Sequence, residues 1–158
     1  MSGFYSTSGV LTHDAALDVG TNESAWDSLE KSIATLRTGP ALAVANLLVL
    51  HPSTWSAIRR VKDAMSRFMV AADPSSDQVN QAWGVDVLST TANPPGRGLL
   101  LDTSKVGYVG VREALPIRIG FTDDDFTRNI VRTVAEERLV LCVTRPAAVL
   151  AISNLPTS

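Results

Sequence analysis

The sequence predicts a single α+β domain, and three observations favour that class. The chain has 158 residues, the length of one ordinary domain, with an apolar fraction of 45% and a charged fraction of 19%. Helical spacing of apolar residues is found in the first half of the chain. The second half consists of short β-rich pieces separated by Gly and Pro. Helices followed by strands are typical of an α+β fold and not of a βαβ repeat.

The first 22 residues combine Gly, Ser, Thr and Asp with short apolar pairs and show no sustained period. We expect them to form an extended, loosely held lead-in that needs a neighbour to order it. An amphipathic helix is predicted next, over about 23–37, with Thr21 or Asn22 as its N-cap and Gly39-Pro40 at its end. Its apolar positions recur at spacings of three, four and three: Trp26, Leu29, Ile33 and Leu36.

A buried strand is predicted for residues 47–50, an apolar run that ends at His51-Pro52. The preceding residues 41–46 are also compatible with a helix. A second helix is predicted over about 52–63, because Pro is tolerated in a first turn and His51 can serve as the helix-entry residue. One face of this helix carries the apolar residues Trp55, Ile58 and Val61.

Turn-forming residues at 73–80 separate these helices from a series of short predicted strands. The last part of the chain is rich in Val, Leu and Ile and predicts two longer strands, about 128–143 and 147–153, joined at Arg145-Pro146. The four short strands that precede them are Val85–Leu88, Leu99–Asp102, Lys105–Val111 and Pro116–Ile119.

The composition argues against several kinds of partner. A formal net charge of -2 leaves no basic stripe to neutralise phosphates, so tight nucleic-acid binding is not expected. The longest apolar stretch, residues 41–50, is about half a bilayer span. The N-terminus lacks the pattern of a secretion signal. The single Cys142 cannot form an internal disulfide and fits a reducing compartment.

The residue patterns do not predict catalysis or metal binding. Neither His13 nor His51 has a Cys, His or carboxylate at ligand spacing. Asp123-Asp124-Asp125 lacks the spacing of a calcium loop and is interpreted as a solvated turn before a strand. The NPPGRG sequence at 93–98 lacks the spacing of a phosphate-binding loop, and Cys142 lies in an apolar strand. We therefore predict no cofactor, no metal site and no ordinary enzymatic activity.

Six short motifs occur in order between residues 51 and 148, and together they are more specific than any one alone. They are His51-Pro52-Ser53-Thr54-Trp55, Val61-Lys62-Asp63 with Phe68, Trp83-Gly84-Val85, Asp124-Asp125-Phe126-Thr127-Arg128-Asn129, Glu136-Glu137-Arg138-Leu139 and Arg145-Pro146-Ala147-Ala148. In this order they resemble the C-terminal half of tailed-bacteriophage major capsid proteins of the Hong Kong ninety-seven type. The lead-in sequence GFYSTSGVLT resembles the segment that follows the spine helix in that family, with Ser6 at a usual Asn position.

The resemblance implies a shell-building function and a division of the chain. Residues 1–20 would form the lead-in, 21–115 an axial domain of α+β type, and 116–158 part of a strand-rich peripheral domain. The family's N-terminal arm, E-loop and spine helix precede this region and are expected to be absent. The implied function is that of a structural subunit, or a truncated or prophage-derived fragment, of an icosahedral bacteriophage capsid. Its partners would be copies of itself or full-length capsid subunits, in the virion and, before assembly, in the host bacterial cytoplasm.

The resemblance also implies roles for single residues. Some members crosslink themselves when an E-loop lysine attacks an Asn with help from a Glu, and Asn129 and Glu136 match those positions. On one regular strand these two residues would lie about 23 Å apart on opposite faces, so only different subunits could bring them to one lysine. The alternative for Glu136, Glu137 and Arg138 is a cross-strand ion-pair set. Intersubunit or structural roles are implied for Trp55, Trp83, Asp125, Phe126, Glu137, Arg138, Arg145 and Pro146.

Two further alternatives are open from the sequence. The chain fits either an engineered piece of a longer capsid protein or a naturally short product. It also fits a stand-alone, capsid-derived binding or interfering protein that recognises a phage or host partner.

Overall fold

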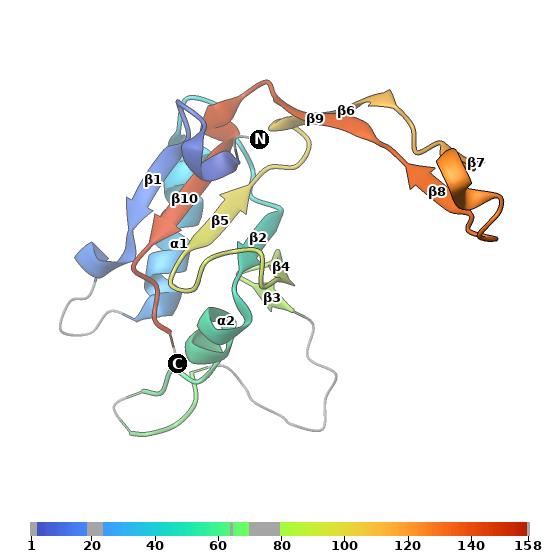
Figure 1. Ribbon diagram of the computed structural model, residues 1–158. Helices are drawn as coiled ribbons and strands as arrows, with labels where there is room; N and C mark the ends of the chain where they lie inside the picture. Colours follow the sequence, from blue (N-terminus) through green and yellow to red (C-terminus); the bar gives the residue numbers. More distant parts are fainter. Residues whose placement is uncertain (1–2, 19–23, 64, 70–79, 158) are drawn as a thin grey trace. The chain divides into compact units, whose positions relative to one another are not determined.

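The computed structural model describes residues 3–18, 24–63, 65–69 and 80–157, and the chain divides into two compact units (Figure 1). Unit 1 contains Met1–Val106 and Arg145–Ser158, and unit 2 contains Gly107–Thr144. Unit 2 is therefore an insertion between two segments of unit 1. No helix among the described residues is long and apolar enough to cross a membrane.

Unit 1 contains a six-stranded mixed sheet. Its strands are β1 (Leu11–Asp14), β2 (Leu47–Leu50), β3 (Gln81–Ala82), β4 (Val85–Ser89), β5 (Gly98–Leu101) and β10 (Val149–Ser153). They lie in the order β1-β10-β5-β2-β4-β3, in which β1–β10 and β2–β4 are parallel pairs and the others are antiparallel. The central strand β5 is buried along its whole length, as its run of three leucines requires.

Two α-helices share the core of unit 1 with the sheet, α1 (Ala25–Thr38) and α2 (Pro52–Arg59). A capping box begins α1, in which the amide of Ser24 donates to the Asp27 carboxylate at 2.7 Å. His51 is the N-cap of α2, as predicted, and its side chain accepts a first-turn amide. Short 3₁₀ turns are η1 (Phe4–Ser6), η2 (Ala15–Asp18) and η4 (Pro146–Ala148). The largest fully buried apolar side chains are Leu29, Leu36, Leu48, Leu50, Ile58, Leu100, Leu150, Ile152 and Val149.

Unit 2 consists of two antiparallel ribbons with two strands each. In one, β6 (Gly107–Glu113) pairs with β9 (Arg138–Val143), and in the other, β7 (Ile117–Gly120) pairs with β8 (Arg132–Ala135). The turn η3 (Asp123–Asp125) lies between β7 and β8. Every residue from 107 to 144 is described, and Asp125 is the one buried residue among them. The unit has no apolar core of its own.

Several predicted elements are confirmed with small shifts. The helix expected over 23–37 is α1, and the strand expected at 47–50 is β2. The strands expected at 85–88 and 99–102 are β4 and β5. The α+β class is confirmed, although β1 and β2 precede or interrupt the helices. The predicted N-caps Thr21 and Asn22, and residues 73–79 of the predicted turn, lie outside the described residues.

The second helix is shorter than predicted, because a turn replaces its last residues. α2 ends at Arg59, and Lys62 then forms an antiparallel bridge with Phe68. The carboxylate of Asp63 accepts the amides of Met65 and Arg67 at 2.9 and 2.8 Å. An Asp side chain that bonds nearby amides offers the backbone an alternative to the helix.

Residues 11–14 of the lead-in are extended and ordered by a neighbour, as predicted, but they are not loosely held. They form the edge strand β1, which pairs in register with β10 from Leu11 opposite Leu150 to Asp14 opposite Ser153. The partner strand β10 lies about 140 residues away in the sequence, so no local sequence pattern could predict the pairing.

The last part of the chain also differs from the prediction. The strand expected over 128–143 is two strands, β8 and β9, because Glu136-Glu137 lies between them and each pairs with a different partner. The strand expected at 147–153 is β10, which lies between β1 and β5 in unit 1. The compact units therefore do not follow the predicted divisions at residues 20 and 115. The axial and peripheral assignments remain predictions.

Candidate functional site

Trp55 and Trp83, which belong to two of the six motifs, both contact Trp26 of α1. The sequence analysis did not predict this role of Trp26. The Trp26 and Trp55 rings meet edge to face with centroids 6.0 Å apart. The Trp26 indole donates to the carbonyl of Ile58 at 3.1 Å, and the Trp83 indole donates to the carbonyl of Trp26 at 3.0 Å. Trp83 has a positive φ, as has Gly84, in the tight turn between β3 and β4. Trp55 is buried and supports the fold, whereas Trp83 is 57% exposed.

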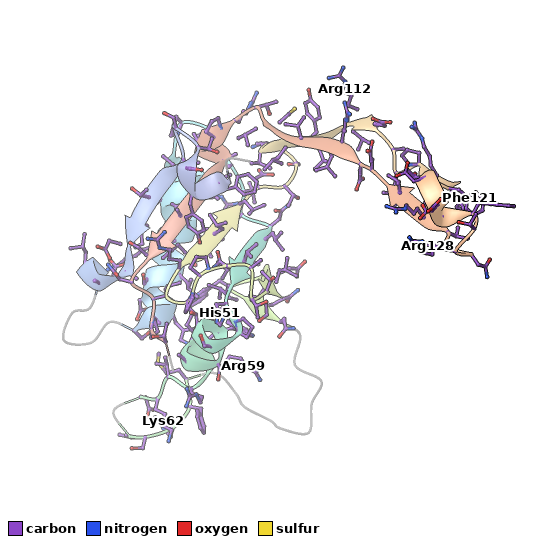
Figure 2. The ribbon with its side chains drawn as sticks, viewed as in Figure 1. His51, Arg59, Lys62, Arg112, Phe121 and Arg128 are labelled. Carbon is purple, nitrogen blue, oxygen red and sulfur yellow. The ribbon has the colours of Figure 1, made fainter. Side chains whose placement is uncertain are left out.

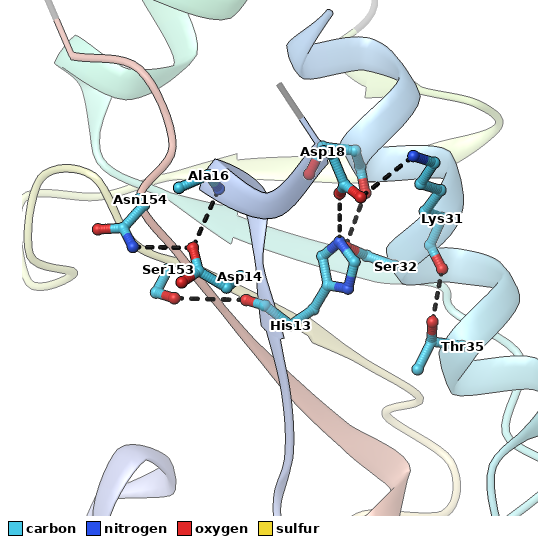
Figure 3. A network of polar contacts seen from close by, with 10 residues as sticks. His13, Asp14, Ala16, Asp18, Lys31, Ser32, Thr35, Ser153 and Asn154 are labelled. Carbon is cyan, nitrogen blue, oxygen red and sulfur yellow. Dashed lines mark hydrogen bonds and ion pairs between the residues drawn. The ribbon is translucent and has the colours of Figure 1, made fainter. Parts of the chain in front are cut away.

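A polar cluster around Asp18 was not predicted (Figure 3). The Nε2 atom of His13 lies 2.6 Å from one Asp18 oxygen, and Lys31 Nζ donates to the other at 3.1 Å. Burial acts to raise the pKa of Asp18, but hydrogen bonds from His13 and Lys31 outweigh it and keep the pKa below its ordinary value. The three side chains come from β1, η2 and α1. The cluster attaches the N-terminal strand to the first helix, and the described residues contain no group that could hold a metal ion.

Asp14 attaches the same strand to the C-terminal segment. Its carboxylate accepts from Asn154 Nδ2 at 2.8 Å and from the amide of Ala16 at 3.0 Å. These two hydrogen bonds hold the pKa of Asp14 below its ordinary value. Polar contacts of Asp14, the last residue of β1, and of Asp18 in η2 thus hold the N-terminal strand in place (Figure 3).

Asp102 organises the loop that precedes β2. Its side chain accepts the amides of Val44 and Ser104 at 3.0 and 3.1 Å, and Lys105 Nζ lies 3.8 Å away. Burial acts to raise the pKa of Asp102, but the hydrogen bonds from Ser104 and Val44 outweigh it and leave the pKa lowered. Lys105 also donates to the carbonyl of Leu42 at 2.7 Å. Leu42 has a φ of 46° and is 70% exposed, so this loop presents an apolar side chain to solvent.

The acidic turn of unit 2 is only partly the solvated turn that was predicted. Asp123 and Asp124 are exposed, but Asp125 is buried because its carboxylate has partners within the loop. Arg132 donates to both Asp125 oxygens, Nε at 2.5 Å and Nη2 at 3.1 Å, and the amide of Thr122 donates at 2.9 Å. The Arg132 guanidinium, followed by the Thr122 amide, lowers the pKa of Asp125.

The predicted crosslink residues do not lie on one regular strand. Asn129 has a φ of 54° in the loop before β8, and Glu136 lies between β8 and β9. The expected separation of about 23 Å for a continuous strand therefore does not apply. Arg138 lies 3.4 Å from Glu113 across the β6–β9 ribbon, which is one cross-strand ion pair of the expected kind. Glu137 lies beside Glu136 and is exposed.

Arg145 and Pro146 line a shallow groove of about 390 Å³ in unit 1, together with Pro40, Ala41 and Ala147. A second groove of about 290 Å³ contains one carboxylate, Asp18, which already has His13 and Lys31 as partners. Neither groove places a nucleophile beside a free base.

Exposed apolar side chains are the most unusual feature of unit 2. Monomeric proteins rarely leave many large apolar side chains together at the surface, and such surfaces mark interaction sites. The predicted intersubunit residue Phe126 is the most exposed of them, at 79%. The others are Tyr108, Val109, Val111, Leu115, Ile117, Ile119, Phe121, Ile130, Val131, Val134, Leu139 and Val140.

Known proteins are similar to this chain in sequence and in fold. Residues 1–154 match the phage capsid family. The chain is 29% identical over 107 residues to the major capsid protein of Enterobacteria phage HK97, a match that covers 67% of this chain and 28% of that protein. The fold is similar to the capsid of an empty GTA particle, with a TM-score of 0.71, 18% identity, and coverage of 93% of this chain and 50% of that chain.

Two further solved structures extend the likeness. Gordonia phage Cozz gives a TM-score of 0.68 at 15% identity and covers 93% of this chain and 50% of that chain. A virus-like particle from Pyrococcus furiosus gives 0.64 at 11% identity, with coverage of 95% and 58%. The chain thus spans about half the length of these solved chains. Because the sequence identities are low, these matches show a shared fold and nothing more. Together with the sequence match over residues 1–154, this fold shows that the chain belongs to the phage capsid family.

Proposed function

We propose that this protein is a structural subunit, or a fragment of one, that acts by self-association in the icosahedral capsid of a bacteriophage. It would be located in the virion and, before assembly, in the cytoplasm of the host. The observation that carries the proposal is the surface of unit 2, where two thin ribbons expose apolar residues and have no core of their own. Membership of the phage capsid family supports copies of the same chain as the covering partner.

The two isolated ribbons of unit 2 need another element to cover them. Two paired strands are marginally stable in water unless a third strand or another element covers an apolar face. Val109 and Val111 of β6 are each 57% exposed, and Ile117 and Ile119 of β7 are 65% and 70% exposed. A specific interface that buries about 1,600 Å² would cover surfaces of this kind. The function of the protein would then depend on the shape of the subunit and on the total area of its contacts with other subunits.

The proposal also covers the division of the chain and the crosslink positions. Unit 1 is the candidate axial-type domain, and unit 2 the candidate portion of a peripheral-type domain. Asn129 is kept as the position where an intersubunit isopeptide bond would form: the amine of a lysine from another subunit would attack the Asn129 side-chain amide and displace ammonia, and Glu136 would take a proton from the attacking amine. No other covalent activity, cofactor, membrane or specific nucleic acid is part of the proposal.

Self-association can be measured directly on the purified chain. We expect sedimentation velocity to show oligomers whose fraction rises with concentration, and negative-stain images to show rings or shell pieces. A chain that stays monomeric up to millimolar concentration, yet binds an intact capsid protein or host factor, would instead support the stand-alone binding protein.

The crosslink positions have a separate test. When the chain is mixed with a full-length family member under shell-forming conditions, an SDS-resistant ladder is expected if the isopeptide bond forms. Glu136→Gln should remove the ladder by removing the base, and Asn129→Asp by removing the amide that is attacked. A ladder that persists in both variants contradicts these assignments.

A further inference from the structure

A third pocket of unit 1 contains an arginine without a counter-ion. The exposed side chain of Arg97 places its guanidinium 5.5 Å from the centroid of the Tyr5 ring. Within the part of the chain that the structure describes, no ion pair engages this guanidinium. A guanidinium keeps its charge and has five N–H donors, so this one is available to an anion. The pocket has a volume of about 200 Å³ and is lined by Tyr5, Thr12, Arg97, Ala151, Ile152 and Ser153.

The turn that carries Arg97 is fixed by hydrogen bonds to buried groups. Asn93, which is 4% exposed, donates from Nδ2 to the Arg97 carbonyl at 2.7 Å. The Gly96 amide donates to Oγ1 of the fully buried Thr54 at 2.9 Å. The Gly96 carbonyl accepts the amide of Leu155, also at 2.9 Å. Because the backbone of this turn is already held, a ligand that binds Arg97 has little chain to order.

The Tyr5 ring forms a fixed, uncharged wall of the same pocket. Its hydroxyl donates to Asn93 Oδ1 at 2.7 Å, so one buried amide holds both Tyr5 and the Arg97 backbone. Burial raises the pKa of the Tyr5 hydroxyl, although the hydrogen bond to Asn93 and the charge of Arg97 act against it. The hydroxyl therefore stays protonated at neutral pH, and the ring does not repel an anion beside it.

The remaining pocket residues indicate what kind of anion fits. Thr12 and Ser153 have hydroxyls that can donate to an oxyanion, and Ala151 and Ile152 are apolar. All four come from the paired strands β1 and β10, in which Thr12 stands opposite Ala151. The fork of an arginine side chain matches the two oxygens of a carboxylate. Drug-sized ligands occupy pockets of about 300–1,000 Å³, so this smaller pocket favours a carboxylate on a short apolar stem over a nucleotide.

We propose that this pocket, the Arg97 pocket, binds a carboxylate that is carried on a short aliphatic stem. Arg97 pairs with the carboxylate, and the apolar side of the pocket contacts the stem. Tyr5 and Asn93 are positioning residues, because they hold the guanidinium and its turn in place. The ligand is either a free short-chain acid or the side chain of a glutamate in another protein. The site lies in unit 1 and does not rest on the proposed self-association.

Saturation-transfer difference NMR of the full chain tests the site, because it detects weak ligands whether or not the protein forms oligomers. Butyrate is the probe for a free acid, and we expect a dissociation constant of about 1 mM. Butyramide has the same stem without the charge and should give no saturation transfer. A capped Gly-Glu-Gly tripeptide is the probe for a side-chain carboxylate, with Gly-Gln-Gly as its uncharged control.

Variants connect this binding to the proposed residues. Arg97→Gln should raise the dissociation constant of butyrate about tenfold or more, because the charged hydrogen bonds are lost. Arg112→Gln is the matched control, since it removes the same charge from an exposed arginine of β6 in unit 2 (Figure 2) and should leave binding unchanged. Tyr5→Leu should weaken binding about two- to fivefold, whereas Tyr5→Phe, which retains the ring, should stay within about twofold.

Each outcome bears on the proposal. The absence of saturation transfer to both butyrate and the glutamate peptide overturns the site, and so does binding that is equal in the wild type and Arg97→Gln. Inorganic phosphate that displaces butyrate at equal concentration overturns the carboxylate assignment. Equal losses in Tyr5→Leu and Tyr5→Phe overturn the positioning role of the ring. Tighter binding of the glutamate peptide than of butyrate supports the site and assigns its ligand to another protein, and the reverse order assigns it to a free acid.

Discussion

Buried acids carry much of the local order in this molecule. Asp102 and Asp125 are both less than 5% exposed; Asp102 accepts from two backbone amides and a hydroxyl, and Asp125 from one backbone amide and a guanidinium. Such groups stabilise the fold only while they are ionised, because protonation removes acceptor capacity and charge. Their backbone-amide partners, in Val44, Ser104 and Thr122, lie in loops, so each acid determines the path of an irregular segment that apolar packing alone would leave undetermined.

The first prediction concerns Asp102. Replacement by Asn keeps the shape but supplies one acceptor oxygen where two are used, so an amide of Val44 or Ser104 loses its partner. We expect Asp102→Asn to lower the free energy of unfolding by about 1–3 kcal/mol, measured by urea denaturation at pH 7. Asp86→Asn is the control, because Asp86 is exposed and its carboxylate accepts from the side chain of Gln81, and its effect should stay within about 0.5 kcal/mol.

The pH dependence provides a second prediction for the same residue. The pKa of Asp102 in the folded state lies below its ordinary value of 3.8, so the unfolded chain binds the proton more readily. The contribution of Asp102 is therefore fully present above pH 3.8 and is lost as the pH falls below it. Urea titrations between pH 2 and pH 6 should show a shallower acid dependence in Asp102→Asn than in the wild type. Equal slopes in the two proteins would contradict this assignment.

At the scale of elements, the sequence predicted best where the signal was local. The apolar spacing of Trp26, Leu29 and Leu36 predicted α1, and all three are buried. The run before His51-Pro52 predicted β2. The sequence could not predict that Leu11–Asp14 would pair with β10, because that choice depends on a strand far away in the chain. The buried state of Asp125 was missed for a similar reason, since its partner Arg132 follows seven residues later across a turn.

The placement of β10 is the element-level correction with the largest energetic consequence. Leu150 is fully buried and stands opposite Leu100 of β5 and Leu11 of β1. Leu150→Ala should lower the free energy of unfolding by about 2–5 kcal/mol, because the removed methyl groups leave a cavity in the core of unit 1. Val140→Ala on β9, where the side chain is 52% exposed, should change it by less than about 0.5 kcal/mol. Comparable effects in the two variants would show that β10 does not contribute to the core as described.

At the scale of the whole molecule, the two units differ in what they bury and what they expose. Unit 1 contains the sheet, both α-helices and the apolar core, whereas unit 2 contains exposed ribbons and one buried acid. The amide of Arg145 donates to the carbonyl of Val106 at 3.3 Å, so the chain leaves unit 1 and returns to it at adjacent points. An insertion with neighbouring ends can be removed without stretching the segments that remain.

The final prediction follows from those neighbouring ends. Consider a variant in which a Gly-Ser linker replaces Gly107–Thr144 and connects Val106 to Arg145. Its unit 1 should still unfold cooperatively, because β5 and β10 remain paired and the apolar core loses no buried side chain. The same variant should sediment as a monomer at concentrations where the full chain forms oligomers, since the exposed ribbons of unit 2 are gone. Circular dichroism during urea denaturation measures the first property and sedimentation velocity the second. Oligomers formed by the shortened chain would place self-association in unit 1, and a chain without a cooperative transition would show that unit 1 needs unit 2 in order to fold.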